Sequence, residues 1–127
     1  MTRTVPSASP YADSIGFSAA VATESLVFTA GFTSASETGV VGVGDAYAQT
    51  VEALRKLLLA LAEVGATAAD VVQTRLYLTD AADWAAVGRA HGEVFDAVRP
   101  AATMVVVAAL LDPAMLVEIE AVAVRPV

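Results

Sequence analysis

The spacing of hydrophobic and polar positions changes several times along the chain, and each change predicts a new element. Residues 1–13 are rich in Ser, Pro and Thr without a regular period, which indicates an irregular arm. Two short runs of β-type composition follow, at 15–21 and 25–32. The three residues between them suit the turn of an antiparallel hairpin. The Gly- and Ser-containing segment 34–44 is expected to be a loop.

From Asp45 onward the apolar residues recur at three- and four-residue steps, which predicts one buried face of a helix. The residues of this face are Val51, Leu54, Leu58 and Leu61. Asp45 is the expected N-cap, and Gly65 is suited to the left-handed position after the helix end. The pattern therefore predicts a helix from about residue 46 to 64.

Residues 71–78 alternate in polarity, which predicts a strand. We expect one face to carry Val72, Thr74, Leu76 and Leu78, and the other to carry Val71, Gln73, Arg75 and Tyr77. A second helix follows, with Asp80 as its cap and a buried side formed by Trp84, Val87, His91, Val94 and Phe95. Arg99-Pro100 ends this helix. Two further strands are expected at 101–110 and 115–124, joined by a turn around Asp112-Pro113.

The predicted order is ββαβαββ, which indicates a single α+β domain over residues 1–127, with a mixed sheet and both helices on one face. The other face would carry apolar residues that a monomer leaves uncovered, namely Phe17, Phe28, Tyr77, Val105 or Val106, and Val122. Self-association would cover them. A ligand pocket between subunits is then expected, because exposed strands make the clefts of one protomer shallow.

Composition narrows the classes of function. Hydrophobic residues make up 57% of the 127 positions, above the usual share of about 45–50%, which again indicates a partner surface. No apolar run reaches the roughly 20 residues of a membrane-spanning helix, and residues 1–10 lack the apolar core of a secretory signal, so a cytoplasmic protein is the simplest expectation. The net charge of −7 argues against nucleic acid and anionic membranes as partners.

Metal and disulfide chemistry is also restricted. The chain has no Cys, so no disulfide framework forms. With His91 as the single histidine, only carboxylates remain as metal ligands, which excludes the usual zinc, copper and iron–sulfur sites and leaves a hard-cation site formally open.

Several segments together resemble the Rid family, also called the YjgF family. The most specific are VVQTRLYLTD at 71–80 followed by Trp84, then Pro100-Ala101, and VEIEA at 117–121. Pro10-Tyr11, the run FTAG at 28–31 and the run GVGDAYAQT at 42–50 are similar to the family's amino-terminal signatures and to the entry of its first helix. The similarity is collinear over nearly the whole chain.

The resemblance implies a chorismate-mutase-like fold and a homotrimer whose sheets form a central barrel with three intersubunit clefts. Archetypal members hydrolyse imines or enamines released by pyridoxal-phosphate enzymes and need no cofactor. Their key Arg binds the substrate carboxylate within a Pro-Ala-Arg-Ser stretch. Here the stretch reads Pro100-Ala101-Ala102-Thr103, so that Arg is missing.

Other positions depart from the family pattern as well. They are Ala30 in place of a Ser, Gly88 in place of an Asn, and Val106 and Ala109 where Glu and Arg are common. Ala102, Met104, Val106 and Ala108 share one strand face and make this wall apolar, so we expect a less charged ligand and poor activity on 2-iminobutyrate-type acids. The chain resembles the Arg-lacking branches of the family.

The resemblance also suggests site residues. Glu120 is the expected proton-transfer residue and Tyr11 a hydrogen-bond donor that closes over the ligand. Gly31 would let the ligand approach the backbone. The remaining expected contacts are Phe17, Phe32, Gly88, Ala102, Thr103, Met104 and Glu118. Glu118 and Glu120 point the same way from one strand, and either could be a base, or both could pair with Arg75 or Arg125 across strands.

Three other features have simpler interpretations. His91 is the single histidine and could belong to a catalytic triad. Its place on the apolar side of the second predicted helix favours a packed, structural histidine instead. Gly42-Val43-Gly44 lacks the third glycine of a dinucleotide site, and Trp84 is expected in the core. Arg75 could bind a ligand acid, although pairing with a neighbouring subunit's Glu is preferred.

Two hypotheses follow. The first is a cofactor-independent enzyme that performs acid/base chemistry, by hydrolysis, tautomerisation or cyclisation, on an imine, enamine or activated carbonyl intermediate, with backbone groups near Gly31 and Thr103 stabilising developing charge. The second is a non-catalytic protein that binds a metabolite or shields a partner surface with the same cleft.

Overall fold

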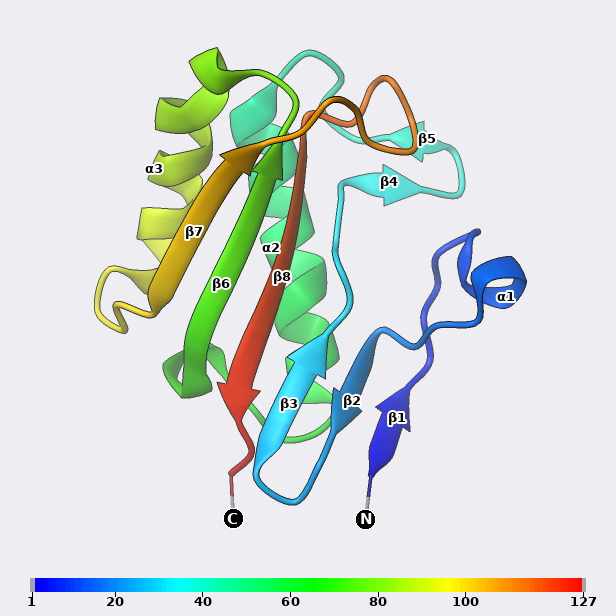
Figure 1. The fold of residues 1–127 in the computed structure, drawn as a ribbon, viewed down its shortest axis with the longest axis vertical. Helices are drawn as coiled ribbons and strands as arrows, with labels where there is room; N and C mark the ends of the chain where they lie inside the picture. The colour runs from blue at the N-terminus through cyan, green and yellow to red at the C-terminus, as the bar shows by residue number, and fades with distance from the viewer. Residues whose placement is uncertain (1, 127) are drawn as a thin grey trace.

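The computed structural model describes residues 2–126, which form a six-stranded sheet with two long helices on one face (Figure 1). The elements are β1 (Arg3–Val5), α1 (Ala12–Ile15), β2 (Ala20–Ala22), β3 (Leu26–Thr29), β4 (Ala35–Ser36), β5 (Gly39–Val40), α2 (Ala46–Ala62), β6 (Val71–Leu78), α3 (Trp84–Phe95), β7 (Ala101–Val106) and β8 (Val117–Val124). Short 3₁₀ turns at Ala68–Asp70 and Ala81–Asp83 precede β6 and α3.

The strand order in the sheet is β1-β2-β3-β8-β6-β7. All neighbours are antiparallel except β6 and β7, which are parallel and connected by α3. Both α2 and α3 lie behind the sheet in Figure 1 and leave its other face uncovered. The predicted two-layer α+β architecture and the core order ββαβαββ are therefore confirmed.

Helix α2 begins and ends close to where the apolar period predicts. Asp45 is the N-cap, and its carboxylate accepts a hydrogen bond of 3.0 Å from the backbone N–H of Ala48. Gly65 has a φ of +78°, the left-handed conformation expected after the helix. The helix is two residues shorter than predicted and ends at Ala62. Val51 is 45% exposed, because the buried stripe passes through Leu54, Leu57 and Leu61 instead.

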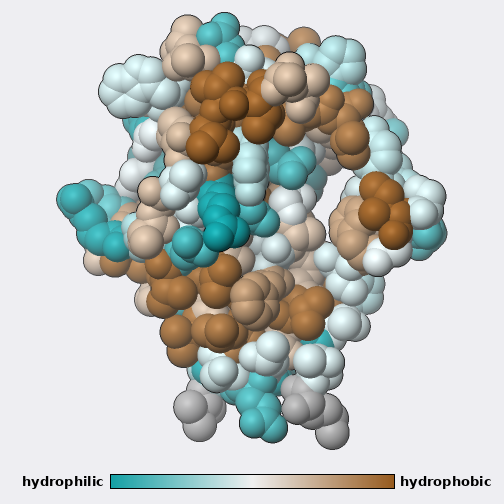
Figure 2. Space-filling view, viewed as in Figure 1, coloured by the Kyte–Doolittle hydropathy of each residue, from teal (hydrophilic) through white to brown (hydrophobic). Residues whose placement is uncertain are grey.

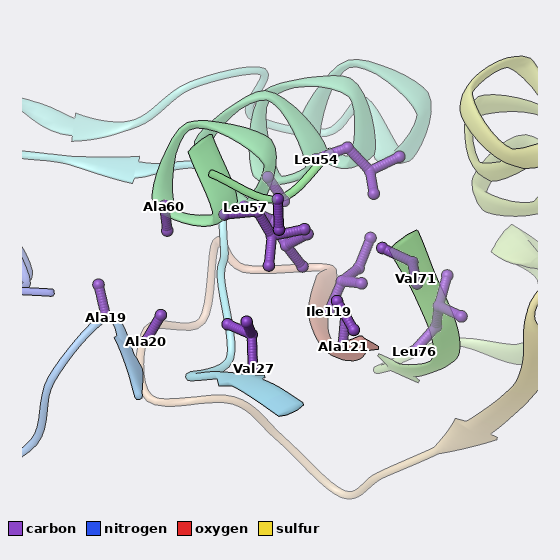
Figure 3. Packing of buried hydrophobic residues seen from close by; sticks show 14 of the residues in the cluster. Ala19, Ala20, Val27, Leu54, Leu57, Ala60, Val71, Leu76, Ile119 and Ala121 are labelled. Atoms are coloured by element: carbon purple, nitrogen blue, oxygen red, sulfur yellow. The ribbon is translucent and has the colours of Figure 1, made fainter. Parts of the chain in front are cut away.

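The core lies between α2 and the covered face of the sheet. Leu54 and Leu57 point from the helix toward Val27, Leu76 and Ile119, and Ala60 lies above Ala19 and Ala20 (Figure 3). Gln49 is fully buried among these apolar groups, yet every polar atom of its side chain is used. Its amide donates to the carbonyl oxygens of Gly42 and Ala114, and its oxygen accepts from the N–H of Leu116. Gln49 thus connects α2 to the loop that precedes β8.

The amino-terminal part is more regular than predicted. The expected irregular arm 1–13 contains β1, which pairs with β2, and the beginning of α1. The predicted strand 15–21 is reduced to β2 because Gly16, at a φ of +87°, ends α1 and the chain reaches the sheet only at Ala20. The predicted strand 25–32 is reduced to β3, and the predicted loop 34–44 contains the β4–β5 hairpin. The turn between β2 and β3 is confirmed.

Two predictions in the second half are wrong for local reasons. A β-bulge between Val71 and Gln73 shifts the alternation of β6 by one residue, so that Val71 is buried and Val72 is 46% exposed. Trp84 is 65% exposed rather than in the core, because α3 begins at this residue after a 3₁₀ turn and its buried stripe uses Val87 and Phe95. The last two strands, β7 and β8, are shorter than predicted.

Candidate functional site

The uncovered sheet face carries both apolar and charged residues. The strand registers place Phe28 beside Val122, Arg75 beside Glu120, and Tyr77 beside Glu118. The sequence left open whether Val105 or Val106 lies on this face. The structure places Val105 here, because it pairs with Tyr77 in the register of β6 and β7. Figure 2 shows a hydrophilic area between two apolar areas on this side of the molecule.

A large cavity of about 920 Å³ opens between this face and the amino-terminal arm. Its walls include Tyr11 and Phe17 of the arm, Gly31 and Phe32 after β3, and Glu118 of β8. These five residues, which come from three separate stretches of the sequence, are thus brought together as expected site residues. The surface is visibly hollowed beside the segment that carries α1 (Figure 2).

Glu118 is the carboxylate of this cavity. Within residues 2–126 it makes no hydrogen bond or ion pair. Burial raises the pKa of the Glu118 carboxyl above its ordinary value, and the neighbouring charge of Glu120 raises it further. A half-buried carboxyl with a raised pKa and no partner is suited to exchanging a proton with a ligand.

Gly31 faces Glu118 directly. A Cβ atom at position 31 would overlap with the Glu118 carboxyl group, so only glycine fits here without displacing that side chain. The flanking backbone is fixed by hydrogen bonds between Phe32 and Ile119, with N···O distances of 2.7 and 2.9 Å. Within the described residues the Gly31 N–H donates to no backbone acceptor.

Glu120 lies in a different environment. The Tyr77 hydroxyl donates a hydrogen bond to Glu120 Oε1, and Arg75 Nη1 lies 3.8 Å from the same oxygen. This hydrogen bond raises the pKa of Tyr77 above its ordinary value. Glu120 lines a smaller neighbouring cavity of about 160 Å³ together with Phe28, Gln73 and Arg75. The expected alternative of pairing with Arg75 is therefore present for Glu120 and absent for Glu118, while Arg125 donates to the Thr23 carbonyl.

The remaining expected site residues do not line the large cavity. Ala102 and Met104 are on the helix side of β7, and Thr103 is on its other side. All six residues of β7 are exposed, because this strand forms the edge of the sheet and the helices do not extend over it. Gly88 lies on α3, with open space around its Cα.

His91 lies between α3 and the sheet. Its Nε2 is 2.8 Å from the Oγ1 of fully buried Thr74, and its ring packs on Phe95 at a centroid distance of 4.7 Å. Burial lowers the pKa of His91 below its ordinary value. These contacts agree with the structural interpretation of this histidine, which lines neither cavity.

Lys56 is a residue of the cavity that the sequence patterns did not single out. It is the only lysine of the chain and lies on α2, three or four residues from buried Ala53 and Ala60. A cation on the buried side of an amphipathic helix was the signal that could have identified it.

The described residues offer neither a membrane-spanning helix nor a cluster of metal ligands. No helix among them is long and apolar enough to span a membrane. No group of three or more His, Asp or Glu side chains in the same part of the chain is arranged to hold a metal ion.

The fold and the cavity define a class of small α+β proteins with a pocket on the uncovered side of a mixed sheet. The family model described as endoribonuclease L-PSP matches residues 7–125, so the chain belongs to this family, which includes the YjgF and Rid proteins. Among solved structures, the YjgF-family protein Rv2704 of Mycobacterium tuberculosis is 43% identical, with a TM-score of 0.88 over 98% of this chain and 99% of that one.

Sequence relatives include one with a stated activity. The uncharacterized protein SCO2049 of Streptomyces coelicolor is 42% identical over 97% of this chain and 92% of its own length. The 3-aminoacrylate deaminase RutC of Acinetobacter baylyi is 36% identical over 79% of each chain. The expected family membership is therefore confirmed.

Proposed function

We propose that this chain is an enzyme that performs cofactor-independent acid/base chemistry on a small imine, enamine or activated carbonyl compound. The observation that carries this proposal is Glu118, an unpaired carboxyl of raised pKa next to the Gly31 backbone in a large cavity. The activity named for the Acinetobacter relative, deamination of an enamine, supports the same reaction class.

In the hydrolytic form of the reaction, the Glu118 carboxyl protonates the enamine carbon and gives an iminium ion. The resulting carboxylate then takes a proton from a water molecule as the water oxygen attacks the iminium carbon, which gives a neutral carbinolamine. Glu118 passes this proton to the nitrogen and takes the hydroxyl proton, so the carbinolamine releases ammonia and leaves a carbonyl product. The Gly31 N–H stabilises charge that develops on the reacting group, and Tyr11 donates a hydrogen bond from the arm.

This proposal moves the proton-transfer role from Glu120, the residue expected from the sequence, to Glu118. The reason is that Tyr77 and Arg75 already engage Glu120, whereas nothing in residues 2–126 engages Glu118. An oxygen that already accepts a hydrogen bond from Tyr77 and lies near Arg75 is less available to a ligand proton than an unengaged one. Glu120 then acts as a neighbour whose charge keeps a proton on Glu118.

The matched pair Glu118→Gln and Glu120→Gln tests the assignment. Ammonia release is measured from imines and enamines generated in situ, including 3-aminoacrylate. Glu118→Gln is expected to lower kcat by about 10²–10⁴-fold, the usual contribution of a general acid or base. Glu120→Gln is expected to lower it by less than about tenfold. Unchanged turnover in Glu118→Gln would reject the assignment, and a loss confined to Glu120→Gln would return the role to Glu120.

We also propose that the working form is a homotrimer in which the β7 edge of one protomer completes the cavity of the next. The exposed β7 and the apolar residues of the uncovered face support this assembly. Ala102, Thr103 and Met104 would then meet the ligand from a second protomer. Sedimentation velocity tests the proposal, with Val105→Lys expected to shift the wild-type trimer toward a monomer. A wild-type chain that sediments as a monomer would contradict it.

A non-catalytic binding protein is the second candidate, because the side chains of Ala102 and Met104 add no polar group to the proposed cleft. This candidate predicts saturable binding of a small molecule that is never consumed. The net charge of −7 disfavours RNA as the ligand, despite the wording of the family description.

A further inference from the structure

The large cavity is lined by a cation, Lys56, that makes no direct ion pair within the described residues. Lys56 is half-buried on α2 and lines the cavity together with Glu118. Within residues 2–126 its ammonium forms no ion pair, because Glu52, which lies close to it in the sequence, is bound by Arg55 at 2.6 and 2.7 Å. Glu52 attracts Lys56 without contacting it, so the half-buried ammonium still lacks a directly bound anion, and an anion from outside the chain could fill that place.

The hydrogen bonds of Lys56 leave one donor free. Its Nζ donates to the carbonyl oxygens of Thr33 and Ala35, both at 2.7 Å. An ammonium group has three donors, so one N–H remains. Burial lowers the pKa of Lys56, although an anion beside it would favour the charged form.

The two hydrogen bonds place the Lys56 ammonium beside the segment that follows Gly31, because Thr33 and Ala35 belong to this segment. Both Lys56 and Gly31 line the large cavity. A small ligand held by Lys56 would therefore lie along the wall that leads to Glu118.

We propose that Lys56 binds the acidic group of the ligand, a carboxylate or a similarly small oxyanion, and so restricts the cavity to small organic acids. This inference rests on the proposed function, since it names the substrate class of the same cavity. It also changes one expectation from the sequence. The apolar wall at Ala102 favours an uncharged ligand, whereas Lys56 places the charge of the ligand at a different wall, formed by α2 and the segment after β3.

Butyrate and butyramide test this inference, because they have nearly the same shape and differ in charge. Binding is followed by ¹H–¹⁵N NMR shifts of the Gly31, Thr33 and Ala35 amides. The wild-type protein is expected to bind butyrate about tenfold or more tightly than butyramide, as a charge-assisted hydrogen bond requires. Equal binding of the two compounds, or shifts that never saturate, would overturn the inference.

Three variants separate the charge of Lys56 from its effect on the loop. Lys56→Gln keeps side-chain N–H donors for the carbonyl groups but loses the charge, and is expected to abolish the preference for butyrate. Lys56→Arg keeps the charge and is expected to retain the preference. Arg89→Gln removes one positive charge outside both cavities and is expected to bind as the wild type does. Wild-type butyrate binding by Lys56→Gln, or loss of the preference in both Lys56 variants, would overturn the inference.

The same assay distinguishes this inference from the catalytic proposal. Glu118→Gln is expected to lose turnover yet still prefer butyrate, because Lys56 is unchanged in it. If Glu118→Gln keeps full turnover while Lys56→Gln loses the preference, the catalytic assignment fails and the acid-binding role of Lys56 stands.

Discussion

A Cβ atom placed on Gly31 would lie 2.8 Å from Cδ of Glu118, so these two residues leave no room for a larger side chain at position 31. Gly31→Ala is therefore expected to displace the Glu118 carboxyl and to lower ammonia release by about tenfold or more, equivalent to roughly 1.4 kcal/mol of barrier. Gly31 is exposed and outside the strands, so the variant is expected to fold. Circular dichroism checks the fold.

Gly92→Ala is the matched control for this variant. Gly92 lies inside α3, and a Cβ atom there would meet nothing within 4 Å. The change is expected to stabilise the protein by about 0.5–1 kcal/mol, since alanine loses less backbone entropy in a helix. Activity is expected to stay unchanged. If both glycine variants lose activity equally, the contact between position 31 and Glu118 does not explain the loss.

Glu118 is also expected to affect the pH dependence of stability. Its pKa is raised in the folded state, so the folded protein binds the proton more tightly than the unfolded chain does. The contribution of Glu118 to the free energy of unfolding is fully present below the ordinary Glu pKa of 4.5 and is lost as the pH rises through the raised pKa. Glu118→Gln avoids this loss, so the Tm of the variant relative to that of the wild type is expected to rise as the pH increases from the ordinary Glu pKa through the raised value, and then to stay constant.

Thermal unfolding followed by circular dichroism checks this prediction at several pH values. Glu37→Gln serves as the control, because Glu37 is an exposed residue and its replacement is expected to leave the pH profile unchanged. A constant difference in Tm between Glu118→Gln and the wild type at all pH values would show that Glu118 does not titrate abnormally.

His91 is expected to give a pH dependence of the opposite sign. Its pKa is lowered in the folded state, so the folded protein favours the neutral ring. The contribution of His91 to the free energy of unfolding is fully present above the ordinary His pKa of 6.5 and is lost as the pH falls through the lowered pKa. The wild-type Tm is expected to decrease over this range more steeply than that of His91→Gln. Parallel profiles of the two proteins would contradict this explanation.

Two leucines of α2 test the position of the core. Leu57 is fully buried, and Leu57→Ala is expected to lower the free energy of unfolding by about 2–5 kcal/mol. Leu59 is 56% exposed, and Leu59→Ala is expected to change it by less than about 0.5 kcal/mol. Urea unfolding measures both. A large effect at Leu59 in a dilute, monomeric sample would indicate that the buried face of α2 differs from the one described.

The sequence predicted the elements whose signals are local and periodic. Helix α2 has a capping Asp45, a regular apolar stripe and a terminal Gly65, so its bounds were predicted within two residues. The range of β6 was predicted correctly from its alternation. Its first two residues were assigned to the wrong faces, because a bulge at Val71/Gln73 depends on pairing with β8, which no pattern within β6 reports.

Sequence signatures predicted some residues of the candidate site but none of its contacts. Tyr11, Gly31 and Glu118 were predicted to neighbour a ligand, and the three residues line one cavity in the structure. The hydrogen bond from Tyr77 that engages Glu120 joins two strands far apart in the sequence, so the alternation of β8 alone could not rank its two carboxylates. Lys56 was missed because its partners are backbone carbonyls, which have no sequence signature.

Strand β7 has a consequence for how the chain behaves during folding. Its residues Ala101–Val106 contain no charge and no proline, and one of its two edges has no strand beside it within the described residues. Such an edge is a template for uncontrolled pairing with other chains. Newly made chains would therefore be prone to aggregate, and a charged gatekeeper residue introduced on this strand would improve their recovery during refolding.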